Sequence, residues 1–357
     1  FTTLANDQSW GTPSGFASSI PVSTDVLLRG GEWEVRVFGD STTNFQVIAL
    51  GNNITHTGGN SILDIDRAGV SGASNKIVTF GNLSLDKQLL LITGSNANYP
   101  RFDGLTTLTS NARIQTDAPL LLNGTIAGNY TLTKTGGSNL EIGADNSAWS
   151  GGTVATDGII LFGTRLPEDS SRYMAGNSNV FSYSASANLG TGDIVINRNT
   201  SIRINAPTNI LTAQGQRVQI FGSLLGNLPR IDIGVDAPIT SYGLRSTSNG
   251  ALNLGLHDGF YTSTIDQAKL GNGKWGLGAW DTTFYTAATM GAGADNVYRF
   301  LGSNAAALGI ASSNALSGTA SLWVGAPQHF NGFALANTSA SIRLYGDQSY
   351  TGNTTIF

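Results

Sequence analysis

The sequence predicts an all-β protein built as an elongated, right-handed parallel β-helix. Three observations lead to this prediction: a composition poor in charge and rich in glycine, short alternating segments bounded by turn residues, and a corner that recurs near the C-terminal end. Charged residues make up 12% of the 357 residues, and 46 residues are Gly, about half and nearly double the usual shares. Asn, Ser and Thr fill the difference. Because these residues form helices poorly, the composition favours strands and turns.

Segments in which apolar and polar residues alternate recur along the chain, each bounded by Gly, Asn or Asp. Alternation over about four to six residues is typical of strands. The clearest segments cover residues 76–80, 89–93, 193–197, 201–205, 230–233 and 341–344. No stretch keeps apolar residues at helical spacing over three turns, and the best helical candidate, residues 305–311, contains Gly309. We therefore expect few helices, none of them long.

A corner made of a strand, a polar turn, an aromatic residue, a glycine and a new strand occurs twice. Trp149 in the first copy aligns with Tyr350 in the second, and Gly151 aligns with Gly352. Internal repetition favours a solenoid over a closed sandwich, with coils of roughly 20 to 25 residues. We expect one continuous β-helical segment over residues 1–357. Both ends break off inside strand-like patterns, so we expect an internal fragment of a longer repetitive protein.

Residues 120–163 carry the clearest copy of a more specific pattern. Its motif positions are Lys134, Gly136, Trp149, Gly151 and Gly152, and residues 342–357 start another copy with Tyr350 and Gly352. The stretch resembles the autotransporter-associated β-strand repeat of bacterial passenger domains, which reads L-x-K-x-G-x-G-x-L-x-L, then Y-S/T-G-G-T, then G-x-L. It departs from that pattern at Ser138, where Gly is usual, and at Trp149, where Tyr is commoner. The resemblance implies an exported parallel β-helix and no particular ligand, because family members share architecture rather than activity.

The bulk composition excludes several classes of function. The 19 basic residues are scattered and the formal net charge is −4, so the basic patch that nucleic acid requires is missing. The absence of Cys removes disulfides and thiolate metal sites. No apolar run reaches about 18 residues, so we expect no transmembrane helix. Together with the resemblance, this composition indicates an extracellular or bacterial outer-surface location.

Asp64 and Asp66 are weak candidates for a calcium site. In residues 63–67 the alternation turns the apolar residues inward and both carboxylates outward on one face. Two such carboxylates provide oxygen ligands for Ca²⁺ or an acid–base pair. The alternative, which we favour, is a solvated surface row with Arg67 as a charge partner.

Other polar features give weaker signals. Asp232 and Asp236 resemble the first pair, and residues 271–276 match G-x-G-x-x-G without a helix start after them, which predicts a glycine-rich corner rather than a dinucleotide site. Three histidines lie far apart in the sequence: His56, His257 and His329. We therefore expect no catalytic residue, no cofactor and no metal.

Aromatic residues gather in the C-terminal third of the chain. They include Trp275, Trp280, Phe284, Tyr285, Tyr298, Phe300 and Trp323. Aromatic rings stack on sugars when they are exposed, but they chiefly bury apolar area in the core. We expect most of these rings to be buried.

The leading hypothesis is a non-enzymatic structural or adhesive protein, a β-helical rod or fibre on the bacterial surface. It would self-associate through its repeats, with a surface glycan as a further partner. The rival is a polysaccharide-active β-helical lyase or hydrolase, in which acidic and basic residues converge in a deep groove. A third alternative, a glycan-binding module, requires aromatic rings exposed in a shallow row.

Overall fold

The chain is all-β over the residues that the computed structural model describes. These are residues 2–5, 24–37, 41–67, 74–144, 146, 148–162, 190–196, 200–204, 218–220, 230–233, 236, 251–254, 259–279, 282–301, 307–325, 329–330, 333–334 and 341–357. Within them the helices are two short 3₁₀ turns, η3 (Gln267–Lys269) and η4 (Ala294–Asn296). The chain divides into two compact units, Phe1–Val154 with Gly158–Gly192, and Ala155–Asp157 with Asp193–Phe357.

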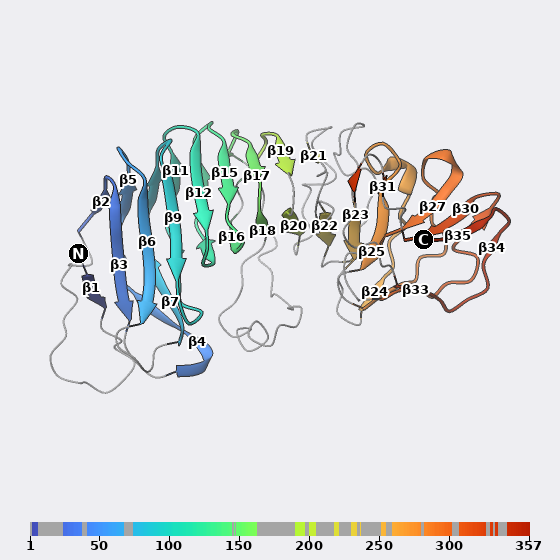
Figure 1. The fold of residues 1–357 in the computed structure, drawn as a ribbon, viewed down its shortest axis with the longest axis horizontal. Helices are drawn as coiled ribbons and strands as arrows, with labels where there is room; N and C mark the ends of the chain where they lie inside the picture. Colours follow the sequence, from blue (N-terminus) through green and yellow to red (C-terminus); the bar gives the residue numbers. More distant parts are fainter. Residues whose placement is uncertain are drawn as a thin grey trace. The chain divides into compact units, whose positions relative to one another are not determined.

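Three sets of parallel strands make up the first unit (Figure 1). The first sheet contains β1 (Thr2–Ala5), β3 (Gly31–Val37), β6 (Ser61–Arg67), β9 (Leu89–Gly94), β12 (Ala112–Thr116), β15 (Leu132–Thr135) and β17 (Thr153–Ala155). The second contains β4 (Ser41–Ala49), β7 (Ser74–Phe80), β10 (Tyr99–Phe102), β13 (Leu120–Leu122), β16 (Asn139–Ile142) and β18 (Gly158–Phe162). The third contains β2 (Val26–Leu28), β5 (Ile54–His56), β8 (Leu83–Leu85), β11 (Thr106–Leu108) and β14 (Ile126–Ala127).

From β2 to β16 the chain visits the third, first and second sheets in one fixed rotation. Each strand pairs in parallel with its counterpart from the previous round, so that Ile65 of β6 lies beside Val35 of β3. The rounds differ in length. The Asn53 side chain reaches Asp25, 28 residues earlier, whereas the Asn123 side chain reaches Asp103, only 20 residues earlier. The later rounds therefore fit the expected 20 to 25 residues, and the first rounds are longer.

The core of the first unit lies between its sheets. Trp33 of the first sheet meets Phe80 of the second with ring centroids 5.6 Å apart, and Phe80 stacks on Phe102 of the next round at 5.3 Å. Buried aliphatic side chains fill the other inward positions, among them Val35, Leu63, Ile65, Leu90, Ile92, Ile114, Leu122 and Ile142. Burial of each such side chain contributes about 1.5–3 kcal/mol.

Asparagine side chains connect the turns of successive rounds. The Asn53 Oδ1 accepts from the Asn82 N–H at 2.7 Å, and the Asn82 Oδ1 accepts from the Leu105 N–H at 2.8 Å. These bonds continue the hydrogen-bonded stacking where the strands end. This is a physical reason for the richness in Asn, because a short side-chain amide satisfies backbone groups at a turn.

Parallel strands also dominate the second unit. One series runs in the order β20 (Thr200–Ile204), β22 (Arg230–Ile233), β23 (Ala251–Leu254), β25 (Gly276–Ala279), β27 (Val297–Phe300), β30 (Ser321–Val324) and β35 (Thr354–Ile356). A four-stranded sheet has the order β24 (Gly259–Tyr261), β26 (Thr283–Tyr285), β28 (Ala307–Ile310) and β33 (Ser341–Leu344). The remaining pairs are β19 (Ile194–Ile196) with β21 (Val218–Ile220), β29 (Ser317–Gly318) with β34 (Ser349–Tyr350), and the antiparallel β31 (His329–Phe330) with β32 (Phe333–Ala334).

The expected all-β class with parallel sheets and without long helices is confirmed for the described residues. The six segments singled out by their alternation all contribute strands: β7, β9, β19, β20, β22 and β33. Within the short helical candidate at residues 305–311, Ala307–Ile310 form β28 instead. Continuity of one β-helix over residues 1–357 stays a prediction.

Candidate functional site

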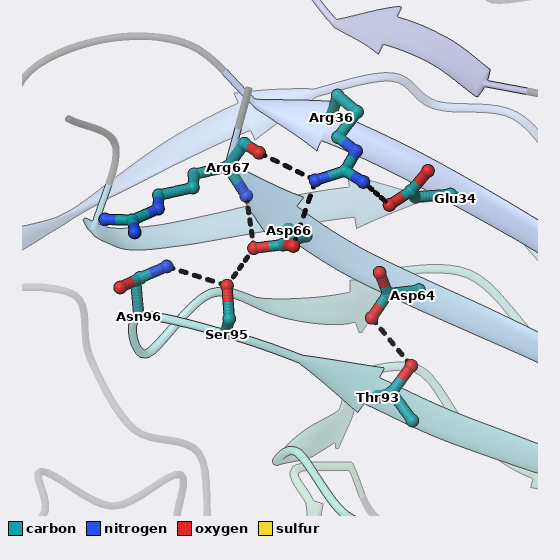
Figure 2. A network of polar contacts seen from close by, with 8 residues as sticks. All are labelled: Glu34, Arg36, Asp64, Asp66, Arg67, Thr93, Ser95 and Asn96. Atoms are coloured by element: carbon teal, nitrogen blue, oxygen red, sulfur yellow. Dashed lines mark hydrogen bonds and ion pairs between the residues drawn. The ribbon is translucent and has the colours of Figure 1, made fainter. Parts of the chain in front are cut away.

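Three carboxylates gather on the outer face of β3 and β6 (Figure 2). The register places Glu34 beside Asp64 and Arg36 beside Asp66. The next strand, β9, places Thr93 beside Asp64. Carboxylate oxygens of Glu34, Asp64 and Asp66 lie within 4.8 Å of one another, which is close enough for three ligands of one cation.

Arg36 occupies the centre of this group. Its guanidinium pairs with the Glu34 carboxylate, and its Nη1 donates to the Asp66 Oδ2 at 3.0 Å. The same nitrogen donates to the carbonyl oxygen of Arg67 at 3.0 Å. Arg36 thus brings a positive charge to the place where a metal ion would bind.

Hydroxyl groups engage two further carboxylate oxygens. Thr93 Oγ1 donates to Asp64 Oδ1 at 2.7 Å, and Ser95 Oγ donates to Asp66 Oδ1. The side chains of Glu34 and Asp66 are 21% and 25% exposed, so the group lies on an accessible surface rather than deep in a groove. A cation here would have to displace a guanidinium and compete with two hydroxyl donors. The geometry therefore favours a charge-paired surface network.

The charge partner differs from the one expected from the sequence. Arg67 contributes its backbone N–H, which donates to Asp66 Oδ1 at 2.6 Å, while its guanidinium points away from Asp66 (Figure 2). Sequence reasoning missed Glu34 and Arg36 because they stand one round earlier, 30 residues before Asp66 in the case of Arg36. The alternation in residues 32–37 was the available signal.

Of the two other acidic candidates, only Asp236 has a described side chain. Asp236 accepts from the backbone N–H of Thr262 at 3.1 Å and from its hydroxyl at 2.5 Å, and from the Ser263 N–H at 3.2 Å. It therefore fixes a turn. Asp232 belongs to β22, and its side chain lies outside the described residues.

The glycine-rich match at residues 271–276 is a turn followed by β25. No helix starts there, which agrees with a corner and not with a dinucleotide site. Gly273 has φ +75, a conformation that favours glycine. His257 lies outside the described residues, and of His329 only the backbone, in β31, is described.

His56 is a core residue of β5. It stacks in register between Leu28 and Leu85, and it is 1% exposed. Its Nδ1 lies 3.8 Å from Asp86 Oδ1. Burial lowers the pKa of His56, and the Asp86 carboxylate partly opposes this shift. The imidazole is thus held in its neutral form within an apolar column.

The repeat motif has a structural explanation at Lys134. This side chain points into the core from β15 and is fully buried, and its Nζ donates to the carbonyl oxygens of Thr135, at 3.2 Å, and Gly136. Gly136 has φ +80, and a Cβ there would lie 2.6 Å from the Thr116 carbonyl oxygen. The lysine donates hydrogen bonds to carbonyl oxygens at the turn, and the glycine lets that turn approach the previous round.

The two copies of the corner share their glycine and differ in their aromatic residue. A Cβ at Gly151 would collide with the Tyr130 carbonyl oxygen, and a Cβ at Gly352 with the Ala320 carbonyl oxygen. Gly152 follows and accepts at its carbonyl from the Leu132 N–H at 2.9 Å, as Asn353 does from Leu322 at 2.8 Å. Trp149 is fully buried, whereas Tyr350 lies half-buried in β34.

Of the C-terminal aromatic residues that the sequence singles out, most of those described are buried, as expected. Those in the core are Trp275, Tyr285, Tyr298 and Phe300. The Arg299 guanidinium lies over the Trp323 ring, 5.2 Å from the ring centroid. Trp280 lies outside the described residues. Phe284 differs, because it faces outward and contacts Phe260 and Tyr345.

No protein-family model, curated protein or solved structure matches the chain. Among the described residues, no helix combines the length and apolar character that crossing a bilayer requires. The chemistry of the described surfaces is what bears on function. Two of these surfaces stand out: the carboxylate network around Arg36 and the outward aromatic rings around Phe284.

Proposed function

We propose that the chain is a non-enzymatic structural or adhesive protein of the bacterial outer surface, an elongated right-handed parallel β-helix. The observation that carries this proposal is the fixed rotation of β2 to β16 through three parallel sheets. Repeated return to the same sheets is the connectivity that a β-helix requires, and a β-helix lengthens into a rod as rounds are added. The similarity of residues 120–163 to the autotransporter-associated repeat supports export to the cell surface.

The polysaccharide-active enzyme is the rival. It requires acids and bases that converge on a substrate in a groove that excludes water. The carboxylates of Glu34, Asp64 and Asp66 do converge, but they are partly open to solvent and engaged by Arg36 and two hydroxyls. Paired and partly solvated carboxylates of this kind support the non-enzymatic alternative.

Adhesion and turnover can be measured on the same purified chain. Beads coated with it should attach to polysaccharide-rich cell surfaces, and no shortened or unsaturated oligosaccharides should appear when it is incubated with those polysaccharides. Small-angle scattering should give an elongated particle. Release of sugar products that Asp64→Asn with Asp66→Asn abolishes would establish the enzyme instead. Failure of the beads to attach, with a compact scattering profile, would leave the proposal without support.

A further inference from the structure

An aromatic strip lies on the outer face of the sheet β24–β26–β28–β33, whose outermost strands β24 and β33 are labelled in Figure 1. It consists of Phe260, Phe284 and Tyr345. Register places Phe260 of β24 beside Phe284 of β26. The ring centroids lie 5.7 Å apart between Phe260 and Phe284, and 5.6 Å apart between Phe284 and Tyr345. Phe260 is 62% exposed and Tyr345 is 56% exposed.

Gly309 makes the strip continuous. This glycine of β28 lies beside Phe284 of β26, at a position where an outward side chain would interrupt the row. A Cβ at this position would lie 2.8 Å from Phe284 Cδ1 and 2.9 Å from Tyr345 Cε2. Because glycine leaves this space free, the Tyr345 ring reaches across β28 to Phe284.

Folding alone does not account for these exposed rings. The inward neighbours in the same two strands are Tyr261 and Tyr285, both fully buried, so the less polar phenylalanines face water while the tyrosines face the core. The Tyr285 hydroxyl is satisfied inside, donating to the Thr289 carbonyl at 2.6 Å. Aromatic surface that stays exposed adds no hydrophobic stabilisation to the fold. Such surface commonly marks an interaction site.

The strip is too narrow for a stable protein interface. An aromatic side chain buries about 150–250 Å² in total. Part of the Phe284 surface is already covered by the neighbouring rings. Three partly covered rings therefore provide far less than the about 800 Å² that each partner contributes to a stable complex. A thin, linear ligand with flat apolar faces fits better. Pyranose rings have such faces, and in an extended chain they recur with a spacing similar to that of these aromatic rings.

Arg343 gives the strip a charge preference. It pairs in register with Gly309, so it stands beside the point where Tyr345 crosses β28, and it is exposed. Within the described part of the chain it takes part in no ion pair. An exposed guanidinium recognises a carboxylate with two parallel hydrogen bonds. Asp236, which bonds to the residues just after Phe260 at the other end of the strip, is occupied by Thr262 and Ser263.

We propose that this strip binds a linear acidic polysaccharide. Its pyranose rings would stack on Phe260, Phe284 and Tyr345, and one uronate carboxylate would pair with Arg343. The inference names a ligand for the proposed adhesive function and rests on that function. A single ligand would account for the exposed rings, for the glycine between them and for the neighbouring guanidinium.

Polygalacturonate oligosaccharides test the strip in calorimetric titrations of the full chain, with cellohexaose as the neutral comparison. The wild-type chain should bind the acidic oligosaccharide more tightly than the neutral one. Phe260→Ala with Tyr345→Ala should lower the affinity for polygalacturonate by about tenfold or more, a change of about 1.4 kcal/mol. Arg343→Gln should lower binding of the acidic oligosaccharide and leave binding of the neutral one unchanged.

Tyr130→Ala is the matched control, because it removes a 39% exposed aromatic ring of the first unit, and it should bind like the wild type. All variants should keep the wild-type melting temperature within about 2 °C. Absence of polygalacturonate binding overturns the inference, as does equal binding of dextran sulfate that the ring variants do not change. Tighter binding of cellohexaose overturns the acidic class. Bead adhesion that survives in the ring variants would defeat this inference and leave the adhesive function standing.

Discussion

The positive charge of Arg36 holds together the carboxylates on the outer face of β3 and β6. It pairs with Glu34 and Asp66, and their oxygens and those of Asp64 lie within 4.8 Å of one another. Without the guanidinium, three like charges would repel at short range. With it, the cluster becomes a network of partly exposed ion pairs, each worth up to about 1 kcal/mol.

Replacement of Arg36 should convert this network into a cation site. Arg36→Gln should destabilise the protein by about 1 kcal/mol, because Glu34 and Asp66 lose their partner. Millimolar Ca²⁺ should restore much of the loss in the variant, since carboxylate oxygens are its preferred ligands. Thermal melting of the wild type should respond neither to Ca²⁺ nor to a chelator. A melting shift of ten degrees when a chelator is added to the wild type would show that a metal site exists despite the guanidinium.

His56 makes stability depend on pH. Burial lowers its pKa from 6.5, so the unfolded chain binds a proton at a pH where the folded chain does not. Its stabilising contribution is therefore present above pH 6.5 and is lost as the pH falls toward the lowered pKa. The free energy of unfolding should decrease in this window with a slope of at most about 1.4 kcal/mol per pH unit.

His56→Leu isolates this effect, because leucines already occupy the neighbouring positions Leu28 and Leu85 of the column. Urea denaturation of both proteins between pH 7 and pH 5 measures the difference in slope. The variant should lack the decrease that the wild type shows. Parallel pH profiles would mean that the buried imidazole is not the titrating group.

At the scale of elements, close approach at glycine corners fixes how one round stacks on the next. Gly151→Ala places a Cβ against the Tyr130 carbonyl oxygen and should cost roughly 1–3 kcal/mol, as overpacking does elsewhere. Gly137→Ala is the matched control, since nothing lies within 4 Å of a Cβ there, and it should change stability by less than about 0.5 kcal/mol. Chemical denaturation separates the two. Equal effects would remove the steric explanation of the corner.

The sequence predicts those parts of the fold that local alternation determines. Residues 76–80 and 89–93 read as strands and form parts of β7 and β9. Pairing between rounds depends on the length of each whole round, which falls from 28 to 20 residues and leaves no fixed period to detect. For that reason Arg36, one round away from Asp66, could not be assigned as its partner.

The aromatic strip was unpredictable for a different reason. In the segments Phe260-Tyr261 and Phe284-Tyr285, polarity alone would turn the tyrosines toward water. The opposite orientation holds because the Tyr285 hydroxyl finds both of its hydrogen-bond partners inside. It donates to the Thr289 carbonyl oxygen and accepts from the Ile265 N–H. Burial raises the pKa of Tyr285 to about 12, so the phenol remains a neutral donor in the core.

At the scale of the whole molecule, two strands that end their sheets among the described residues carry or adjoin exposed apolar side chains. β33 and β35 each lie at one end of their strand order. Leu344 is 45% exposed, Ile356 is 75% exposed and Phe357 is 47% exposed. Unpaired strand edges attract further strands unless charge or proline blocks them, and a net charge of −4 on 357 residues gives little repulsion.

We therefore predict that the chain self-associates through these edges. Sedimentation across a hundredfold dilution series should show oligomers at the higher concentrations that dissociate on dilution. Leu344→Lys with Ile356→Lys should shift the chain toward monomer, because lysines at an edge oppose strand pairing. Leu105→Lys, which alters a 42% exposed leucine of the first unit, should leave the association unchanged. A monomer at every concentration would contradict the prediction, and so would an equal response to both lysine variants, because the association would then follow net charge rather than strand edges.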